Sequence, residues 1–138
     1  MKVKDWMAKE VVTIAPEASA KEAFALMKSL KIRHLVVVKE GVVLGIVTDR
    51  DLRRPTVSDV FKSWHDLYRV SDEFHVEDVM VSPVITIDAN ADIQEAAELI
   101  VKHRIGALPI TDAHAGLAGI LTETDLLKAL ISKQRESF

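Results

Sequence analysis

The sequence predicts a mixed α/β (α+β) fold made of two copies of one β-α-β-β-α unit. Residues 3–37 align without gaps to residues 76–110, and the phrase GIVTDRDL (45–52) returns as GILTETDL (119–126). In both copies, short β-branched runs alternate with segments of helical apolar spacing. Because a unit of about 50 residues buries little surface alone, we expect the copies to pack together with pseudo-two-fold symmetry.

The strands follow from β-branched and apolar runs bounded by turn residues. The first strand of each copy is predicted at VVTI (11–14) and VITI (84–87). Two further strands per copy form hairpins around Gly41 and Gly116. These hairpin strands are predicted at 35–38 and 43–47 in the first copy, and at 108–111 and 117–121 in the second.

Helix-capping residues mark where the helices begin. Ser19 with Glu22 forms the capping-box pattern S-x-x-E, and Asp92 with Glu95 repeats it with a different cap. Helical apolar spacing follows both caps. A last helix is predicted after Thr48, where Pro55 stops it early, and over about 123–132 in the second copy.

The chain therefore divides into repeat 1 (1–54), a linker (55–74) and repeat 2 (75–138). Within the linker, residues 60–68 place apolar and aromatic side chains on one helical face, which predicts a short amphipathic helix. This helix has two interpretations: it closes the core, or it presents a face to a partner protein.

Composition excludes several classes of function. The net charge of −3 argues against binding nucleic acid through phosphate neutralisation, and the absence of Cys excludes disulfides and thiolate metal sites. The five His have no metal-ligand spacing, and no P-loop is present, so a nucleotide would be sensed rather than hydrolysed. With no secretory signal and no membrane-spanning run, we expect a cytoplasmic protein.

The Thr and Asp of the repeated phrase have two interpretations. A Thr at the start of a helix accepts from a first-turn N–H, and an Asp three residues later is favoured by the helix dipole, so Thr48–Asp51 and Thr122–Asp125 form helix caps. The same geometry suits a nucleotide, because a carboxylate accepts from both ribose hydroxyls and a helix N-terminus attracts phosphate.

These motifs resemble a tandem pair of CBS domains, often called a Bateman module. The resemblance rests on the V-x-D-V-M-like starts, the strands RHLVVV and GALPIT, and the G-h-h-T-x-x-D-L endings, in which h is any apolar residue. Within the family, the chain is most similar to bacterial acetoin-utilisation-type CBS-pair proteins. The resemblance implies a regulatory homodimer without enzymatic activity that binds AMP, ADP, ATP or S-adenosylmethionine in two clefts between the repeats.

Carried over residue by residue, the resemblance implies crossed clefts, in which the T-x-x-D of one repeat faces the base pocket of the other. The first cleft would contain Val11, Val12, Thr13, Arg33, His34, Leu35, Thr122 and Asp125. The second would contain Thr48, Asp51, Arg53, Pro83, Val84, Ile85, Gly106, Ala107 and Leu108. Arginines beside either cleft suit phosphate.

Three functions follow from these observations. The first is a stand-alone sensor of an adenosine-containing ligand, whose binding changes the shape of the pair and is read by a regulated protein that the sequence does not identify. The second is a structural dimerisation scaffold in which T-x-x-D only caps helices. The third, an enzyme of nucleotide metabolism, lacks a nucleophile and base in the sequence.

Overall fold

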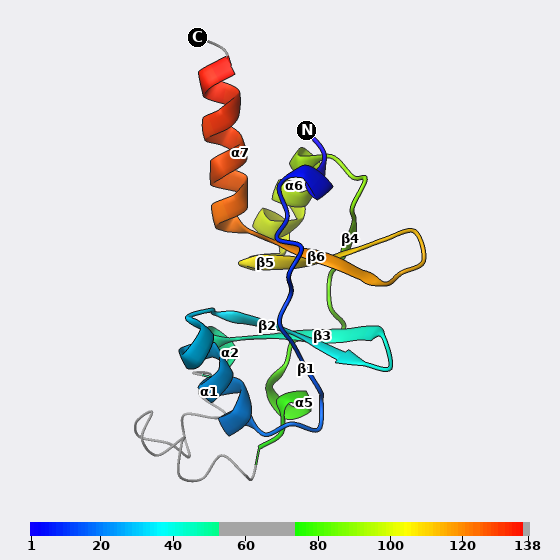
Figure 1. The fold of residues 1–138 in the computed structure, drawn as a ribbon, viewed down its shortest axis with the longest axis vertical. Coiled ribbons are helices and arrows are strands. Elements are labelled where there is room, and N and C mark those ends of the chain that lie inside the picture. Colours follow the sequence, from blue (N-terminus) through cyan, green and yellow to red (C-terminus); the bar gives the residue numbers. More distant parts are fainter. Residues whose placement is uncertain (53–73, 137–138) are drawn as a thin grey trace. The chain divides into compact units, whose positions relative to one another are not determined.

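The computed structural model describes residues 1–52 and 74–136, and these form two compact units (Figure 1). One, called here the first-repeat unit, is Val12–Val84. The other, the second-repeat unit, combines Met1–Val11 with Ile85–Phe138. The compact units therefore differ from the sequence repeats, because the first eleven residues belong with the second copy. The predicted linker helix at 60–68 lies outside the described residues.

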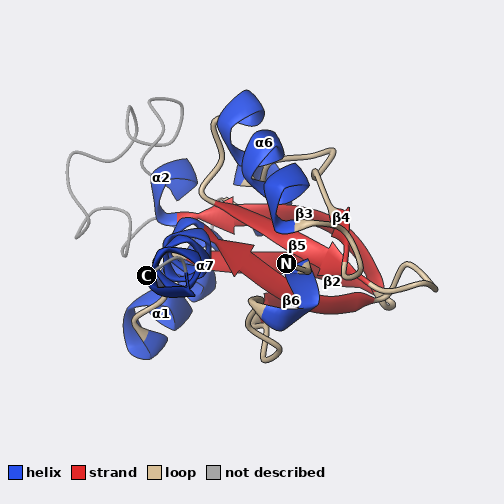
Figure 2. Cartoon of the chain, turned by 90° about the horizontal axis from the view of Figure 1, so that it is seen from above, coloured by secondary structure: helices blue, strands red, loops and turns tan. Residues whose placement is uncertain are grey.

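Both units contain a mixed three-stranded sheet of the same topology, which confirms the predicted α/β class (Figure 2). The first-repeat unit contains β1 (Thr13–Ile14), α1 (Ala20–Leu30), β2 (His34–Lys39), β3 (Val42–Thr48), α2 (Asp49–Leu52) and α5 (Val76–Val79). In it, β1 pairs parallel to β2, and β2 pairs antiparallel to β3. This order places the start of β2 beside the end of β3, where the helix α2 begins.

The second-repeat unit repeats this arrangement. It contains the 3₁₀-helix η1 (Val3–Asp5), β4 (Ile87–Asp88), α6 (Ile93–His103), β5 (Ala107–Thr111), β6 (Leu117–Thr122) and α7 (Glu123–Glu136). Again the first strand is parallel to the second, and the second and third form an antiparallel hairpin. The end of β6 leads directly into α7 (Figure 1).

Local residue chemistry explains where α1 and α6 begin and end. The Ser19 hydroxyl accepts from the Glu22 N–H at 3.1 Å, and the Asp92 carboxylate accepts from the Gln94 N–H at 2.9 Å, so both predicted caps are confirmed. The Gln94 N–H also lowers the pKa of Asp92. Both helices end in a left-handed residue, Lys31 or Arg104, whose backbone N–H bonds back to the last turn.

A hydrophobic core lies between the helices and one face of the sheet in each unit. In the first-repeat unit, Leu35, Val37 and Val47 pack with apolar residues of α1 and α5. In the second, Leu108, Ile110 and Leu121 pack with α6 and with Val3. Because successive side chains of a strand point to opposite faces, residues such as Val36 and Pro109 lie on the other face of their sheets.

The short segment at the start of each sequence copy completes the core of the other copy's unit. We call these two segments, residues 1–8 and residues 74–81, the arms. Each arm makes five backbone hydrogen bonds of 2.7–3.3 Å to its unit, at equivalent positions. The second-repeat unit binds Met1, Val3, Lys4 and Ala8, and the first-repeat unit binds Phe74, Val76, Glu77 and Val81. Val3 and Val76 are fully buried. The two sequence copies have therefore exchanged their arms.

The glycine of the repeated phrase is where the end of each arm meets the sheet. A Cβ built on Gly45 would lie 2.7 Å from the carbonyl oxygen of Val81, and one on Gly119 would lie 2.7 Å from that of Ala8. Atoms at that distance overlap, so only glycine admits the arm's main chain here. This requirement explains why the phrase keeps its Gly in both copies.

Five elements differ from the sequence predictions. The first strands are only two residues long, Thr13–Ile14 and Ile87–Asp88, because each pairs with only two residues of the neighbouring strand. The last helix is longer than predicted and runs over Glu123–Glu136. Neither η1 nor α5 was expected, although both begin at the Val of the repeated V-x-D start.

We predict that Gly45→Ala and Gly119→Ala each lower the free energy of unfolding by about 1–3 kcal/mol, since the new methyl group overlaps main-chain atoms of the arm. Urea denaturation of each variant would measure the loss. The control is Gly116→Ala, whose Cβ would meet only the exposed Asp112 side chain, at 3.2 Å. A smaller loss is expected there, and equal losses at all three positions would contradict the arm contact as the cause.

Candidate functional site

Both copies of the T-x-x-D motif form a reciprocal hydrogen-bonded pair at the start of a helix. The Thr48 N–H donates to Asp51 Oδ2 at 2.9 Å, and the Asp51 N–H donates to Thr48 Oγ1 at 3.1 Å. At the second copy, the Thr122 N–H donates to Asp125 Oδ2 at 2.9 Å, and the Asp125 N–H donates to Thr122 Oγ1 at 3.4 Å. This is a capping box with Asp in the third position, so the capping interpretation is confirmed.

The two carboxylates differ in their surroundings. Asp51 is only 4% exposed, whereas Asp125 is partly exposed. The Thr122 hydroxyl also donates to Asp125 Oδ2, at 3.1 Å. All three contacts of this cap use Oδ2 or the Thr hydroxyl, and Oδ1 of Asp125 receives no hydrogen bond from residues 1–52 or 74–136. That oxygen is therefore available to a hydroxyl donor outside the chain.

The first turn of each helix is acidic. Asp49 and Asp51 lie in the first turn of α2, and Glu123 and Asp125 lie in the first turn of α7. Carboxylates here are favoured by the helix dipole, but their negative charge also cancels the positive potential that would attract a phosphate. The two motifs are thus better suited to hydroxyl donors than to anions.

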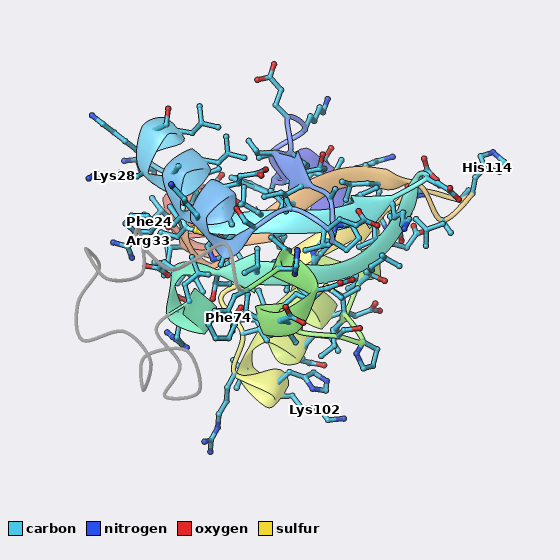
Figure 3. The ribbon with its side chains drawn as sticks, turned by 90° about the horizontal axis from the view of Figure 1, so that it is seen from below. Phe24, Lys28, Arg33, Phe74, Lys102 and His114 are labelled. Carbon is cyan, nitrogen blue, oxygen red and sulfur yellow. The ribbon has the colours of Figure 1, made fainter. Side chains whose placement is uncertain are left out.

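The strand starts that the sequence analysis assigned to the clefts lie beside the T-x-x-D caps of their own units. His34 pairs with Thr48, and the Arg33 carbonyl accepts from the Asp49 N–H at 3.1 Å. At the equivalent place Ala107 pairs with Thr122, and the Gly106 carbonyl accepts from the Glu123 N–H at 3.2 Å. These contacts join main chains. The Arg33 side chain is exposed and extends away from the sheet (Figure 3).

The predicted base-pocket residues divide into two groups. Leu35 and Leu108 are fully buried in the two cores, so their side chains serve the packing of the units. Ala107 is also buried, at 3% exposure, whereas the remaining described residues of this set keep some exposure. They are Val11, Val12, Thr13, Pro83, Val84, Ile85 and Gly106. Arg53 lies outside the described residues, and the crossed pairing of the clefts stays a prediction because it joins residues of both units.

Other kinds of site find no support in the part of the chain that the structure describes. No three His, Asp or Glu side chains lie together in a way that could hold a metal ion among these residues. His114 lies in the turn of the β5–β6 hairpin, at the end away from the Thr122 cap of its own unit (Figure 3). Its backbone N–H and that of Gly116 lower the pKa of Asp112, which shapes this turn. No described helix has the length and hydropathy to cross a membrane.

The chain belongs to the CBS domain family, because the family pattern matches it twice, over residues 3–55 and 76–132. The two matches confirm the resemblance found in the motifs and make the chain a tandem CBS pair. They begin at Val3 and Val76, the buried valines of the two arms.

Two curated relatives show how such pairs occur in other proteins. The CBS domain-containing protein YhcV of Bacillus subtilis is 32% identical over 124 residues, which cover 90% of this chain and 81% of that protein. Inosine-5'-monophosphate dehydrogenase of Thermoplasma acidophilum is 38% identical over 119 residues. This match covers 86% of the chain but only 21% of the enzyme, so it concerns the CBS part alone.

Solved structures share the fold over almost the whole chain. The CBS domain pair of protein MJ0100, in complex with 5'-methylthioadenosine and S-adenosyl-L-methionine, has a TM-score of 0.80 at 25% identity and covers 96% of this chain and 98% of its own. A putative acetoin utilization protein (AcuB) from Vibrio cholerae has a TM-score of 0.77 at 29% identity, with coverage of 98% and 93%. CBSX2 in complex with AMP, at 24% identity, supports the fold alone.

We predict that removing either capping hydroxyl, by Thr48→Val or Thr122→Val, lowers the free energy of unfolding by about 0.5–2 kcal/mol. A first-turn N–H then loses its acceptor, at 3.1 Å or 3.4 Å respectively. Urea denaturation measures both losses. Thr124→Val, at an exposed position in the first turn of α7, is the matched control and should stay within about 0.5 kcal/mol of the wild type.

Proposed function

We propose that this tandem CBS pair is a regulatory protein that senses an adenosine-containing ligand, such as AMP, ADP, ATP or S-adenosylmethionine. The observation that carries the proposal is the open Oδ1 of Asp125, held in place by a cap that uses only Oδ2. A ribose hydroxyl would donate to this oxygen, and Asp51 would serve the second cleft. The complex of the MJ0100 CBS pair with two adenosine derivatives supports this ligand class.

In the proposed crossed arrangement, the base lies against the strand starts of the opposite repeat. Val12 and Thr13 would serve the Asp125 cleft, and Val84 and Ile85 the Asp51 cleft. These residues keep some exposure and lie a few positions after the arms, so a bound base would contact the segment that connects an arm to the next strand in the sequence. Ligand binding would thereby be transmitted to the regulated protein as a conformational change.

The phosphate groups need a cation beyond the caps. The acidic first turns of α2 and α7 repel phosphate, so binding of a polyphosphate depends on side chains such as the exposed Arg33. The family resemblance, with its crossed pairing, assigns Arg33 to the Asp125 cleft, although the Arg33 main chain bonds to Asp49. Mutagenesis distinguishes the two clefts.

A second function, a dimerisation scaffold, is favoured by one observation on α7. Leu127, Leu130 and Ile131 are 58%, 53% and 51% exposed and follow the i, i+3, i+4 spacing of one helix face. An apolar face of this kind is suited to a second copy of the chain. The sensor and the scaffold are compatible, and we propose a cytoplasmic homodimer without enzymatic activity.

Ligand binding should raise the melting temperature by several degrees, because a ligand at about 100 times its dissociation constant stabilises one site by roughly 2.7 kcal/mol. Titration calorimetry on Asp125→Asn and Arg33→Ala then distinguishes the contribution of the ribose to binding from that of the phosphates. Asp125→Asn should weaken adenosine and ATP alike, whereas Arg33→Ala should weaken ATP about tenfold, since one charge-assisted hydrogen bond is worth roughly 1.5–3 kcal/mol.

The matched control is Asp92→Asn, the same substitution at the cap of α6, which should bind every ligand like the wild type. If Arg33→Ala weakens only the site that Asp51→Asn abolishes, Arg33 belongs to the cleft of its own unit and the crossed assignment is wrong. The melting curve of ligand-free protein could also stay unchanged with AMP, ADP, ATP and S-adenosylmethionine at millimolar concentration. That result would contradict the sensing function and leave the dimerisation scaffold as the function.

Light scattering behind gel filtration should give about twice the chain mass of 15.3 kDa. Leu130→Glu places a charge in the apolar face of α7 and should shift the protein toward the monomer. Val42→Glu, at another exposed apolar position, should leave the mass unchanged. A wild-type monomer at tens of micromolar protein, with and without ligand, would contradict the homodimer.

A further inference from the structure

Each arm carries a methionine at the same place, directly before the residue that bonds to the sheet. These are Met7, before Ala8, and Met80, before Val81. The Met7 sulfur lies 2.7 Å from a Cβ built on Gly119, and the Met80 sulfur lies 2.8 Å from one built on Gly45. Both thioethers therefore occupy the space that a side chain on the strand would fill.

The four methionines of the chain differ in exposure. Met1 is 42% exposed and Met27 is 4% exposed, whereas Met7 and Met80 are partly exposed. Met7 and Met80 also pack against the edges of the two hydrophobic cores. Their partial exposure leaves both side chains open to a small oxidant from one side, whereas on the other side each sulfur lies against a glycine of the strand.

We propose that Met7 and Met80 are a pair of oxidation sites whose modification releases the arms from β6 and β3. The reactant is a two-electron oxidant, represented by hydrogen peroxide. A sulfur lone pair attacks one peroxide oxygen, an S–O bond forms and the O–O bond breaks. The displaced hydroxide takes up the proton of the transferred oxygen, so the products are methionine sulfoxide and water.

The contacts of the arm explain why this oxidation releases it. The sulfoxide oxygen is polar and needs hydrogen-bond donors, whereas the sulfur lies beside a glycine Cα and a core edge. Next to Met7, the N–H and carbonyl of Ala8 exchange hydrogen bonds of 2.9 Å and 3.0 Å with Ile120. Val81 and Ile46 make the equivalent pair next to Met80. If the oxidised side chain moves out of this contact and takes the neighbouring main chain with it, these bonds break.

The test treats the whole chain with increasing hydrogen peroxide and locates each added oxygen by peptide mass spectrometry. We expect Met1 to react first, Met7 and Met80 next, and Met27 last. Once Met7 and Met80 are oxidised, amide hydrogen exchange of residues 1–8 and 74–81 should accelerate by about tenfold or more. Methionine sulfoxide reductases of both stereochemical types should restore the original exchange rates.

The control variant is Met7→Leu combined with Met80→Leu, which keeps apolar side chains of similar volume and removes the reactive sulfurs. Its arms should exchange at the same rate before and after peroxide. The proposal is overturned if Met7 and Met80 stay unmodified when Met1 is fully oxidised, if they are oxidised without faster exchange of the arms, or if the Leu variant accelerates equally. No ligand is added, so the outcome is independent of the proposed sensing function.

Discussion

The main chain of each arm contacts a strand at a glycine, and the rest of each unit depends on this close approach. It places a buried valine, Val3 or Val76, at the side of a core that the unit's own repeat leaves open. It also fixes β6 and β3, whose last residues are Thr122 and Thr48. The candidate site is therefore positioned by a segment that comes from the other copy of the sequence.

The residue types that cap a helix also suit a ribose, and in the proposed site the same side chains would do both. A cap satisfies first-turn N–H groups, and Thr and Asp do so in both copies. A carboxylate has two oxygens, however, and the cap at Asp125 uses only one of them. One residue can thus hold its own rotamer through Oδ2 and present Oδ1 in a fixed direction.

Much of this fold could be predicted from the sequence, because the strong signals are local. The Ser19 and Asp92 caps and the strands of the two hairpins depend on neighbouring residues, and these were found where predicted. The first strand of each copy was shorter than predicted. The arms could not be predicted, because their partners lie far along the chain and a V-x-D start does not specify which sheet it joins. The role of Gly45 depends on a main-chain contact that no residue pattern displays. The crossed clefts stay predictions for the same reason.

The exchange of arms has a consequence for how such a chain could arise. A protein with a single repeat, built on the same exchange, could complete its core only with the arm of a second molecule. Two such molecules would trade arms reciprocally, as in a domain-swapped dimer. Duplication and fusion of the gene would place both arms on one polypeptide and convert a concentration-dependent association into an intramolecular one. On that history, the contacts of the arms with Gly45 and Gly119 would descend from contacts between two molecules.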